Sequence, residues 1–320
     1  MFDLSIELGI PLKTLTYLEK IRSRLYTRFY LRKSDGSKRE INPYLCDSRI
    51  NPYDEKMRDY SKLLKRVHRG IKDVLTKYIE LPDCVFGFRP GCNIKDAVKK
   101  HVGKKYLVVL DIRNFFPSTT SDDVYNALVE HGVHTFNAWL IARLVAFHGR
   151  LPQGAITSPI ASNIAFKKYD LKIIEYAKSN GFTYTRYADD MAFSTDRDLI
   201  EEDIKQLISD IAEIIKPYEV KDRKVRWFGP DEPHYLLGLQ LNKKINVPKQ
   251  KRRILRAAVH NYVRKHKVPY GVDPIKYKAS LKAKLGYVLF INKIPSLEKL
   301  KEDLLKFDPN EVTEWETIQV

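Results

Sequence analysis

The pattern of apolar and polar positions divides the chain into strands and helices. Continuous or alternating apolar residues predict strands at 106–110, 183–187 and 191–194, and a hairpin at 29–33 and 38–43 with its turn at Asp35-Gly36. Apolar residues at helical spacing predict helices at 15–30, 60–80, 158–174, 196–216, 249–267, 275–290 and 296–307. Helices mixed with antiparallel hairpins indicate an α+β fold.

Two adjacent acids, Asp189 and Asp190, stand between two of the predicted strands. Neighbouring residues of a regular strand point to opposite faces, so a doublet inside a strand would bury one acid. A tight turn leaves both carboxylates accessible to a divalent metal ion. We therefore predict a hairpin that presents these two acids at its turn.

A third acid, Asp111, ends the apolar segment 106–110. A carboxylate at the end of a buried strand is costly unless it binds something. With the doublet it supplies the oxygen ligands that two Mg²⁺ ions, about 3.5–4 Å apart, need for in-line phosphoryl transfer. The alternative is a solvated turn and a capping acid. A second doublet, Asp122-Asp123, follows Ser121 and is better explained as acids at a helix N-terminus beside a capping serine.

Four motifs follow one another in a fixed order between residues 110 and 239. They are Leu110-Asp111 with Phe115-Phe116, then Leu151-Pro152-Gln153-Gly154 with Ser158-Pro159 and Asn163, then Tyr187-Ala188-Asp189-Asp190, then Leu237-Gly238-Leu239. Together they resemble the palm of reverse transcriptases. The upstream segment Phe86-Gly87-Phe88-Arg89-Pro90-Gly91 is most similar to the bacterial branch that contains retron and group II intron enzymes.

The resemblance covers about residues 20 to 290 and implies a right-hand polymerase with fingers, palm and a small helical thumb. N-terminal helices and fingers are expected at 1–105, and a palm of antiparallel sheet and helices, with the catalytic centre, at 106–240. A helical thumb is expected at 241–310 and a frayed acidic tail at 311–320. We expect no RNase H, endonuclease or maturase module.

The resemblance also implies roles for individual residues. Asp111, Asp189 and Asp190 are the expected catalytic metal ligands for two Mg²⁺ ions, with Mn²⁺ as a substitute, and the backbone carbonyl of Ile112 is a further oxygen ligand. The expected nucleotide-binding residues are Lys38 and Arg39 over the triphosphate, Phe116 as steric gate, Gln153 and Gly154 beside base and sugar, and Lys224 as proton donor to pyrophosphate. Arg186 and Tyr187 are expected to support the hairpin and the primer end. For Lys38 and Arg39 the alternative is ordinary solvated charge.

Composition independently favours a nucleic-acid partner. Lys and Arg number 57 against 40 Asp and Glu, which gives a formal charge of +17. The predicted helix at 249–267 is apolar on one side and basic on the other, which suits a thumb that grips a template and primer duplex, although a solvated face is the alternative. The expected nucleic-acid-binding residues are Arg89, Leu237, Gly238, Lys251, Arg252, Arg253 and Arg256.

The sequence gives little support for a membrane protein, a secreted protein or a zinc site. No segment approaches ~18 uninterrupted apolar residues, and residues 1–4 lack the pattern of a signal peptide, so we expect a cytoplasmic protein without a membrane partner. His131, His134 and His148 have no cysteine or carboxylate at ligand spacing, so they predict no zinc site.

Two short signatures bear on the kind of reverse transcriptase. Retron enzymes carry Asn-Ala-x-x-His before the first catalytic strand and Val-Thr-Gly after the catalytic hairpin. Here His101 stands at the expected distance, whereas Ala97-Val98 and Leu236-Leu237-Gly238 replace the other residues.

The expected function is an RNA-directed DNA polymerase that copies a dedicated, structured non-coding RNA into DNA from dNTPs. A retron-like antiphage role follows from the resemblance, with RNA/DNA product and an effector protein or second subunit as partners. One alternative is a defence-associated reverse transcriptase that makes repetitive or protein-primed DNA within an assembly. The other, of a different class, is an RNA-binding scaffold with an idle polymerase centre.

Overall fold

The computed structural model describes residues 2–32, 36–47 and 55–316. Contacts divide the chain into two compact units. The larger unit comprises Met1–Ala97 and Tyr106–Trp227, and the smaller unit comprises Val98–Lys105 and Phe228–Val320. The fingers, palm and thumb boundaries expected from the sequence stay a prediction. No helix in these described ranges is both long and apolar enough to span a membrane.

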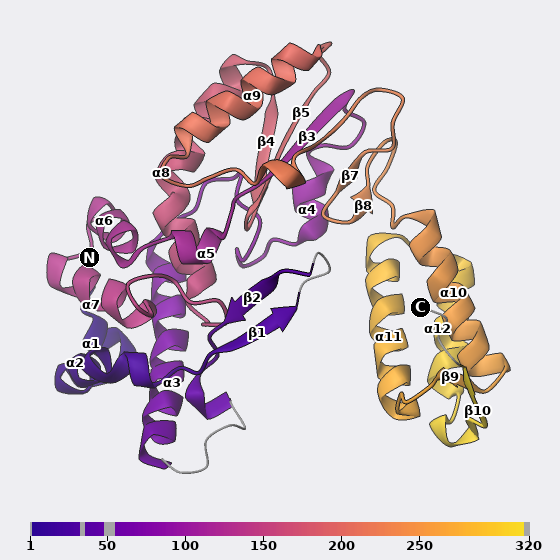
Figure 1. Cartoon of the computed structure of the whole chain (residues 1–320), viewed down its shortest axis with the longest axis horizontal. Helices are drawn as coiled ribbons and strands as arrows, with labels where there is room; N and C mark the ends of the chain where they lie inside the picture. Colours follow the sequence, from indigo (N-terminus) through magenta and orange to yellow (C-terminus); the bar gives the residue numbers. More distant parts are fainter. Residues whose placement is uncertain (1, 33–35, 48–54, 317–320) are drawn as a thin grey trace. The chain divides into compact units, whose positions relative to one another are not determined.

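A four-stranded sheet is the centre of the larger unit (Figure 1). Its strands lie in the order β4 (Thr183–Tyr187), β5 (Asp190–Thr195), β3 (Tyr106–Asp111) and β6 (Arg226–Phe228). β5 pairs antiparallel with both β3 and β4. Helix α8 (Ser158–Ser179) packs against β4, and α9 (Glu201–Ile214) packs against α8. Every residue of β3 and β5 after the first is buried, so burial does not alternate along these two strands.

Helices from the first half of the chain pack against α8 or against one another and form the rest of the larger core. They are α1 (Leu4–Leu8), α2 (Leu12–Ile21), α3 (Glu55–Tyr78), α5 (Phe115–Ser118), α6 (Ser121–Glu130) and α7 (Thr135–Val145). The hairpin of β1 (Phe29–Arg32) and β2 (Lys38–Ile41) projects from this helical layer (Figure 1). α4 (Ile94–Lys99) precedes β3 in the chain.

The smaller unit is built on three helices that pack against one another. They are α10 (Lys249–Arg264), α11 (Pro274–Ile291) and α12 (Pro295–Lys306), and their apolar faces bury Leu255, Val259, Tyr262, Leu281 and Leu285. A short hairpin of β7 (Tyr235–Leu236) and β8 (Leu239–Gln240) precedes them. β9 (Lys267–Pro269) pairs in parallel with β10 (Glu314–Glu316).

The structure confirms most predicted elements and corrects three. The helix predicted at 15–30 ends at Ile21 and is followed by a 3-10 turn at Arg22–Arg24. Thr120, not Ser121, caps α6, and Asp123 completes a capping box with it. The acidic tail was expected to be frayed, but Glu314–Glu316 forms a strand. Asp35 of the predicted fingers turn lies outside the described residues.

A buried polar chain crosses the core of the larger unit from α3 towards the segment at 151–157. His68 Nε2 donates to the Leu144 carbonyl oxygen at 3.0 Å, so Nδ1 accepts from the Tyr44 hydroxyl at 2.7 Å. The Tyr44 oxygen in turn accepts the Ile156 N–H at 3.0 Å. Burial lowers the pKa of His68 from 6.5 to about 4, so the imidazole is neutral in the folded protein.

We expect this histidine to make the protein less stable in mild acid. Its folded pKa lies below its unfolded pKa, so stability is fully present above pH 6.5 and is lost as pH falls towards 4. At about pH 5 the loss is about 2 kcal/mol of unfolding free energy. His68→Gln should remove that share of the pH dependence, measured by urea unfolding of variant and wild type at about pH 8 and pH 5. An equal pH-dependent loss in both proteins would contradict the assignment.

Candidate active site

The three predicted catalytic acids meet at one end of the central sheet. Asp111 is the last residue of β3 and Asp190 is the first residue of β5, and the two lie directly opposite each other in the antiparallel ladder. Asp189 occupies the turn between β4 and β5, where its backbone oxygen accepts the Ile112 N–H at 2.9 Å. The sheet register thus places Asp111 opposite Asp190, with Asp189 next to Asp190 in the turn, and the predicted hairpin with acids at its turn is confirmed.

Burial and mutual repulsion act on these carboxylates. Burial, followed by the charges of Asp189 and Asp111, raises the pKa of Asp190 to about 6. Burial and the charge of Asp111 raise the pKa of Asp189 as well. The Lys224 ammonium forms an ion pair with the Asp111 carboxylate. Asp189 and Asp190, half-buried and with raised pKa values, form with the nearby Asp111 an environment that an added cation would stabilise.

The acids do not form a complete metal cage by themselves. Across the residues that the structure describes, no three Asp, Glu, His or Cys side chains gather to hold a metal ion. Mg²⁺ commonly keeps several waters and takes one or two carboxylates together with substrate phosphates. Asp111, Asp189 and Asp190 fit that mode of binding, in which the nucleotide completes the ligand set. The role of the Ile112 carbonyl stays a prediction.

Arg186, which is fully buried, stabilises the hairpin turn through hydrogen bonds. Its guanidinium forms two bonds with the Asp170 carboxylate of α8, at 2.6 Å to Oδ2 and 2.9 Å to Oδ1. Nη1 donates to Asn163 Oδ1 at 2.9 Å and to the Ala188 carbonyl at 3.0 Å. Ala188 has the left-handed backbone angle φ 57°, which L-residues rarely adopt. Arg186 thus fixes the backbone of the turn that carries Asp189.

The segment at 84–88 lies along the outside of the same turn. The Arg186 N–H donates to the Cys84 carbonyl at 2.7 Å, and the Phe86 N–H donates to the Arg186 carbonyl at 2.9 Å. Asn163 Nδ2 donates to the Gly87 carbonyl at 2.9 Å. A Cβ at position 87 would lie 2.3 Å from the Ala188 nitrogen, so only glycine fits against the turn.

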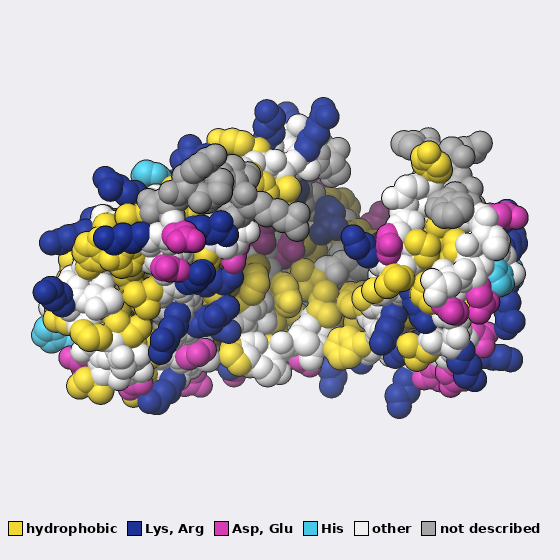
Figure 2. Space-filling view, turned by 90° about the horizontal axis from the view of Figure 1, so that it is seen from below, with side chains coloured by type: hydrophobic (Ala, Val, Ile, Leu, Met, Phe, Trp, Pro, Cys, Tyr) yellow, Lys and Arg dark blue, Asp and Glu magenta, His cyan; other side chains and the backbone are white. Residues whose placement is uncertain are grey.

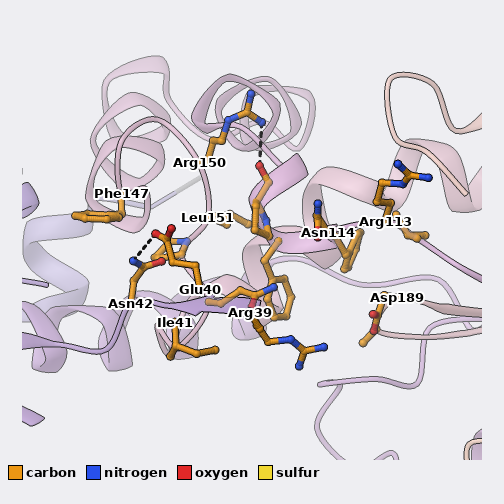
Figure 3. A pocket seen from close by; sticks show the side chains of 18 of the residues that line it. Arg39, Glu40, Ile41, Asn42, Arg113, Asn114, Phe147, Arg150, Leu151 and Asp189 are labelled. Atoms are coloured by element: carbon orange, nitrogen blue, oxygen red, sulfur yellow. Dashed lines mark hydrogen bonds between the residues drawn. The ribbon is translucent and has the colours of Figure 1, made fainter. Parts of the chain in front are cut away.

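Asp111 and Asp189 line a cavity of about 660 Å³ (Figure 3), and Asp190 is not among the residues that line it. Residues of β2, of the segment following β3, and of the segments at 147–154 and 188–189 line it. The Asn42 N–H donates to the Gln153 carbonyl at 2.7 Å and joins two of these walls. Gly154 has φ 117°, and a Cβ there would approach the Asn42 oxygen at 3.4 Å. The buried Gln153 Oε1 finds no hydrogen-bond partner among the described residues, which leaves it available to a ligand.

Cations line the cavity beside the acids. Lys38, Arg39 and Lys224, all expected from the sequence, are among them. Arg39 points towards Asp189 in Figure 3, and its charge offsets a small part of the rise that burial and Asp111 cause in the pKa of that carboxyl. Further cations that were not expected are Arg28, Arg113, Arg150 and Lys221. Arg113 lies between Asp111 and Phe115, and Arg150 directly precedes the motif that begins at Leu151. Their positions beside these motifs could have identified them from the sequence.

The cavity also contains the predicted steric gate, Phe116, which is half-buried. Its ring lies 5.9 Å from that of the buried Phe115 and 6.2 Å from that of Phe88, measured between ring centroids. Asp111, Asp189, Lys38, Arg39, Phe116, Gln153, Gly154 and Lys224 therefore line one cavity. The role of each in catalysis stays a prediction.

The predicted nucleic-acid-binding residues lie in both units. Arg89 belongs to the larger unit, where it pairs with Asp83 at 3.3 Å and donates to the Pro82 carbonyl at 3.0 Å. Leu237 and Gly238 have left-handed backbones at the turn between β7 and β8. On α10, Lys251, Arg253 and Arg256 are exposed and Arg252 is half-buried. Figure 2 shows Lys and Arg side chains over much of the faces of both units that it presents.

Comparison with known proteins defines the class of this chain. Residues 52–241 match the reverse transcriptase (RNA-dependent DNA polymerase) family, which is more than half of the chain. The chain belongs to the reverse transcriptase family, and the right-hand polymerase fold expected from the sequence agrees with this finding.

Among bacterial relatives, the similarity is to retron enzymes. The chain is 28% identical to the retron Mx65 reverse transcriptase of Myxococcus xanthus over 72% of its own length and 56% of that protein. It is 27% identical to the retron Ec86 reverse transcriptase of Escherichia coli over 68% of its own length and 71% of that protein. The chain thus spans about half of the first relative and more of the second, and these similarities support a reverse transcriptase of the bacterial retron type.

Comparison with solved structures supports the polymerase fold and nothing beyond the fold. Telomerase from Candida albicans, in complex with a fragment of telomeric RNA, superposes with a TM-score of 0.52 at 12% identity. The superposition covers 87% of this chain and 59% of that chain.

The close contact between Gly87 and the hairpin turn generates a testable expectation. Gly87→Ala should push the turn away and misplace Asp189, because the added Cβ would meet backbone at 2.3 Å. We expect DNA synthesis to fall by about 100-fold, measured by primer extension alongside thermal unfolding. Gly286→Ala is the control, since a Cβ there meets nothing within 4 Å. Full activity of Gly87→Ala would show that the turn does not depend on this contact.

Proposed function

We propose that this chain is an RNA-directed DNA polymerase that adds dNTPs to a primer. The observation that carries the proposal is the pairing of Asp111 with Asp190 beside Asp189, at the edge of a cavity that is also lined by cations. Acids that share a site with Lys and Arg suit a substrate that combines a metal ion with a triphosphate. Membership of the reverse transcriptase family supports the same chemistry.

Reverse transcriptases generally use divalent metal ions. Asp111, Asp189 and Asp190 would hold them, as two Mg²⁺ ions or with Mn²⁺ as substitute, and the bound ions would neutralise charge on the phosphates. Lys224 lies against Asp111, and its side chain would turn from Asp111 to the leaving pyrophosphate, to which the ammonium group can donate a proton.

The remaining cavity residues would bind the nucleotide. Lys38 and Arg39 of the β1–β2 hairpin would contact the triphosphate, because both are exposed and both line the cavity. Gln153 would offer its unpartnered buried side-chain oxygen to the nucleotide. Gly154, which carries no Cβ, would let the sugar approach the backbone. Phe116 would occupy the space of a ribonucleotide 2′-hydroxyl.

The template proposed for this polymerase is a dedicated, structured non-coding RNA. Similarity to the retron Mx65 and Ec86 reverse transcriptases supports this assignment. The formal charge of +17 suits a partner rich in phosphates. A cytoplasmic antiphage role, with an effector protein or second subunit, completes the proposal.

Removal of one metal-binding acid should abolish synthesis without abolishing RNA binding. Asp111→Asn and Asp189→Asn each remove a carboxylate charge from the cavity and leave the basic surfaces intact. We expect primer extension with Mg²⁺ to fall to background, while RNA affinity measured by filter binding stays within about twofold. Asp122→Asn, an exposed acid of α6, is the matched control. Retained synthesis in either variant would refute the metal assignment.

Nucleic acid that copurifies with the protein should identify the template. Expressed with its native flanking DNA, the protein should carry one structured RNA encoded beside its gene, and DNA copied from that RNA. Sequencing before and after RNase treatment is the measurement. Repetitive DNA without an RNA template would favour the protein-primed alternative. RNA without any DNA, under conditions that support synthesis, would favour the scaffold.

A further inference from the structure

Phe88 combines two features that are unfavourable for a phenylalanine. Its backbone lies in the left-handed region at φ 60°, and its side chain is 50% exposed. An L-residue with a bulky side chain rarely adopts this conformation, and such strain tends to occur at functional sites. The side chain lines the cavity that contains the catalytic acids.

The protein holds Phe88 in this conformation through its neighbours. Phe86 is hydrogen-bonded to the Arg186 backbone, and the Gly87 carbonyl accepts from Asn163 Nδ2 at 2.9 Å. Both partners belong to the buried network that fixes the hairpin turn. The position of the Phe88 ring is therefore tied to the same framework that positions Asp189.

Phe88 is the outermost member of a series of aromatic rings that leads from the core into the cavity. Phe166 contacts Phe115 at 5.4 Å, Phe115 contacts Phe116 at 5.9 Å, and Phe116 contacts Phe88 at 6.2 Å between ring centroids. Phe115 and Phe166 are both buried, and Phe115 is the one of the two that contacts the Phe116 ring. Phe88 is the aromatic neighbour of Phe116 that lies on the exposed side.

We propose that Phe88 is a positioning residue for sugar selection, which acts by holding the ring of Phe116 in place. This inference rests on the proposed polymerase function and on Phe116 as the gate. A gate excludes a 2′-hydroxyl only if its ring cannot turn aside, and Phe115 and Phe88 are the two aromatic rings that contact it among the described residues. Because Phe88 contacts the Phe116 ring and is itself half exposed, its loss would leave space beside that ring into which the ring could turn.

The test compares incorporation of ribonucleotides and deoxyribonucleotides on one primed RNA. We expect Phe88→Ala to lower the ratio of kcat/KM for dNTP over rNTP by about 3- to 10-fold, the range for loss of one aromatic contact. Phe88→Tyr keeps the ring and should keep the ratio. Phe116→Ala should lower the ratio further, and the double variant should match Phe116→Ala alone, because Phe88 then has no ring to hold.

Controls separate this role from a general effect on the fold. Phe136→Ala removes a phenylalanine of α7 that is 41% exposed and does not line the cavity, so the ratio should be unchanged. Phe88→Ala should unfold within about 2 °C of wild type, since its side chain is half exposed.

Three results would overturn the inference. They are an unchanged ratio in Phe88→Ala, an equal loss in Phe88→Tyr, and fully additive effects in the double variant. If the wild-type protein incorporates no nucleotide at all, the proposed function itself fails, which is a distinguishable result.

Discussion

The geometry of the catalytic turn depends on one buried ion pair, between Arg186 and Asp170. Both side chains are 0% exposed, and their shortest contact is 2.6 Å. Burying two charges costs free energy that their attraction need not recover, so such a pair is weak evidence for stability. Its value here is positional, because the same guanidinium also donates to Asn163 and to the Ala188 carbonyl. Asp170 does not occupy Nη1 of Arg186, and this nitrogen donates to the Ala188 carbonyl of the turn that carries Asp189.

The local patterns were sufficient to predict the elements that carry the acids. Two strand patterns on either side of Asp189 and Asp190 predicted the β4–β5 hairpin, and a continuous apolar segment predicted β3 with Asp111 at its end. Long-range contacts were not predictable in this way. Nothing near Arg186 in sequence points to Asp170 of α8, and the need for glycine at position 87 arises only when the 84–88 segment meets the hairpin. The strand at Glu314–Glu316 was missed for the same reason, because its partner β9 lies far away in sequence.

Electrostatics in the cavity follow from this arrangement. The sheet register brings Asp111 opposite Asp190. Burial, together with the negative charges of the neighbouring carboxylates, raises the pKa values of Asp189 and Asp190. Cations on the surrounding walls offset that repulsion, and Lys224 does so most directly through its ion pair with Asp111. The nucleotide of the proposed function would bring metal ions and phosphates, and thus both signs of charge, so it would replace the ion pairs within the cavity with pairs of its own. The site is therefore complementary to a charge distribution rather than to a single charge.

To discriminate between two sugars that differ by one hydroxyl group, the residues that line the cavity must be held rigidly. On one side of the cavity, the Asn42 N–H bonds to the Gln153 carbonyl, and Tyr44 with His68 ties the following segment to the core through Ile156. On the other side, the 84–88 segment is tied to the hairpin through Arg186 and Asn163. Both walls thus end in buried polar groups whose hydrogen bonds are costly to break. Between them Phe116 contacts one aromatic ring that is buried and one that is exposed, so its freedom to move is set by the exposed ring.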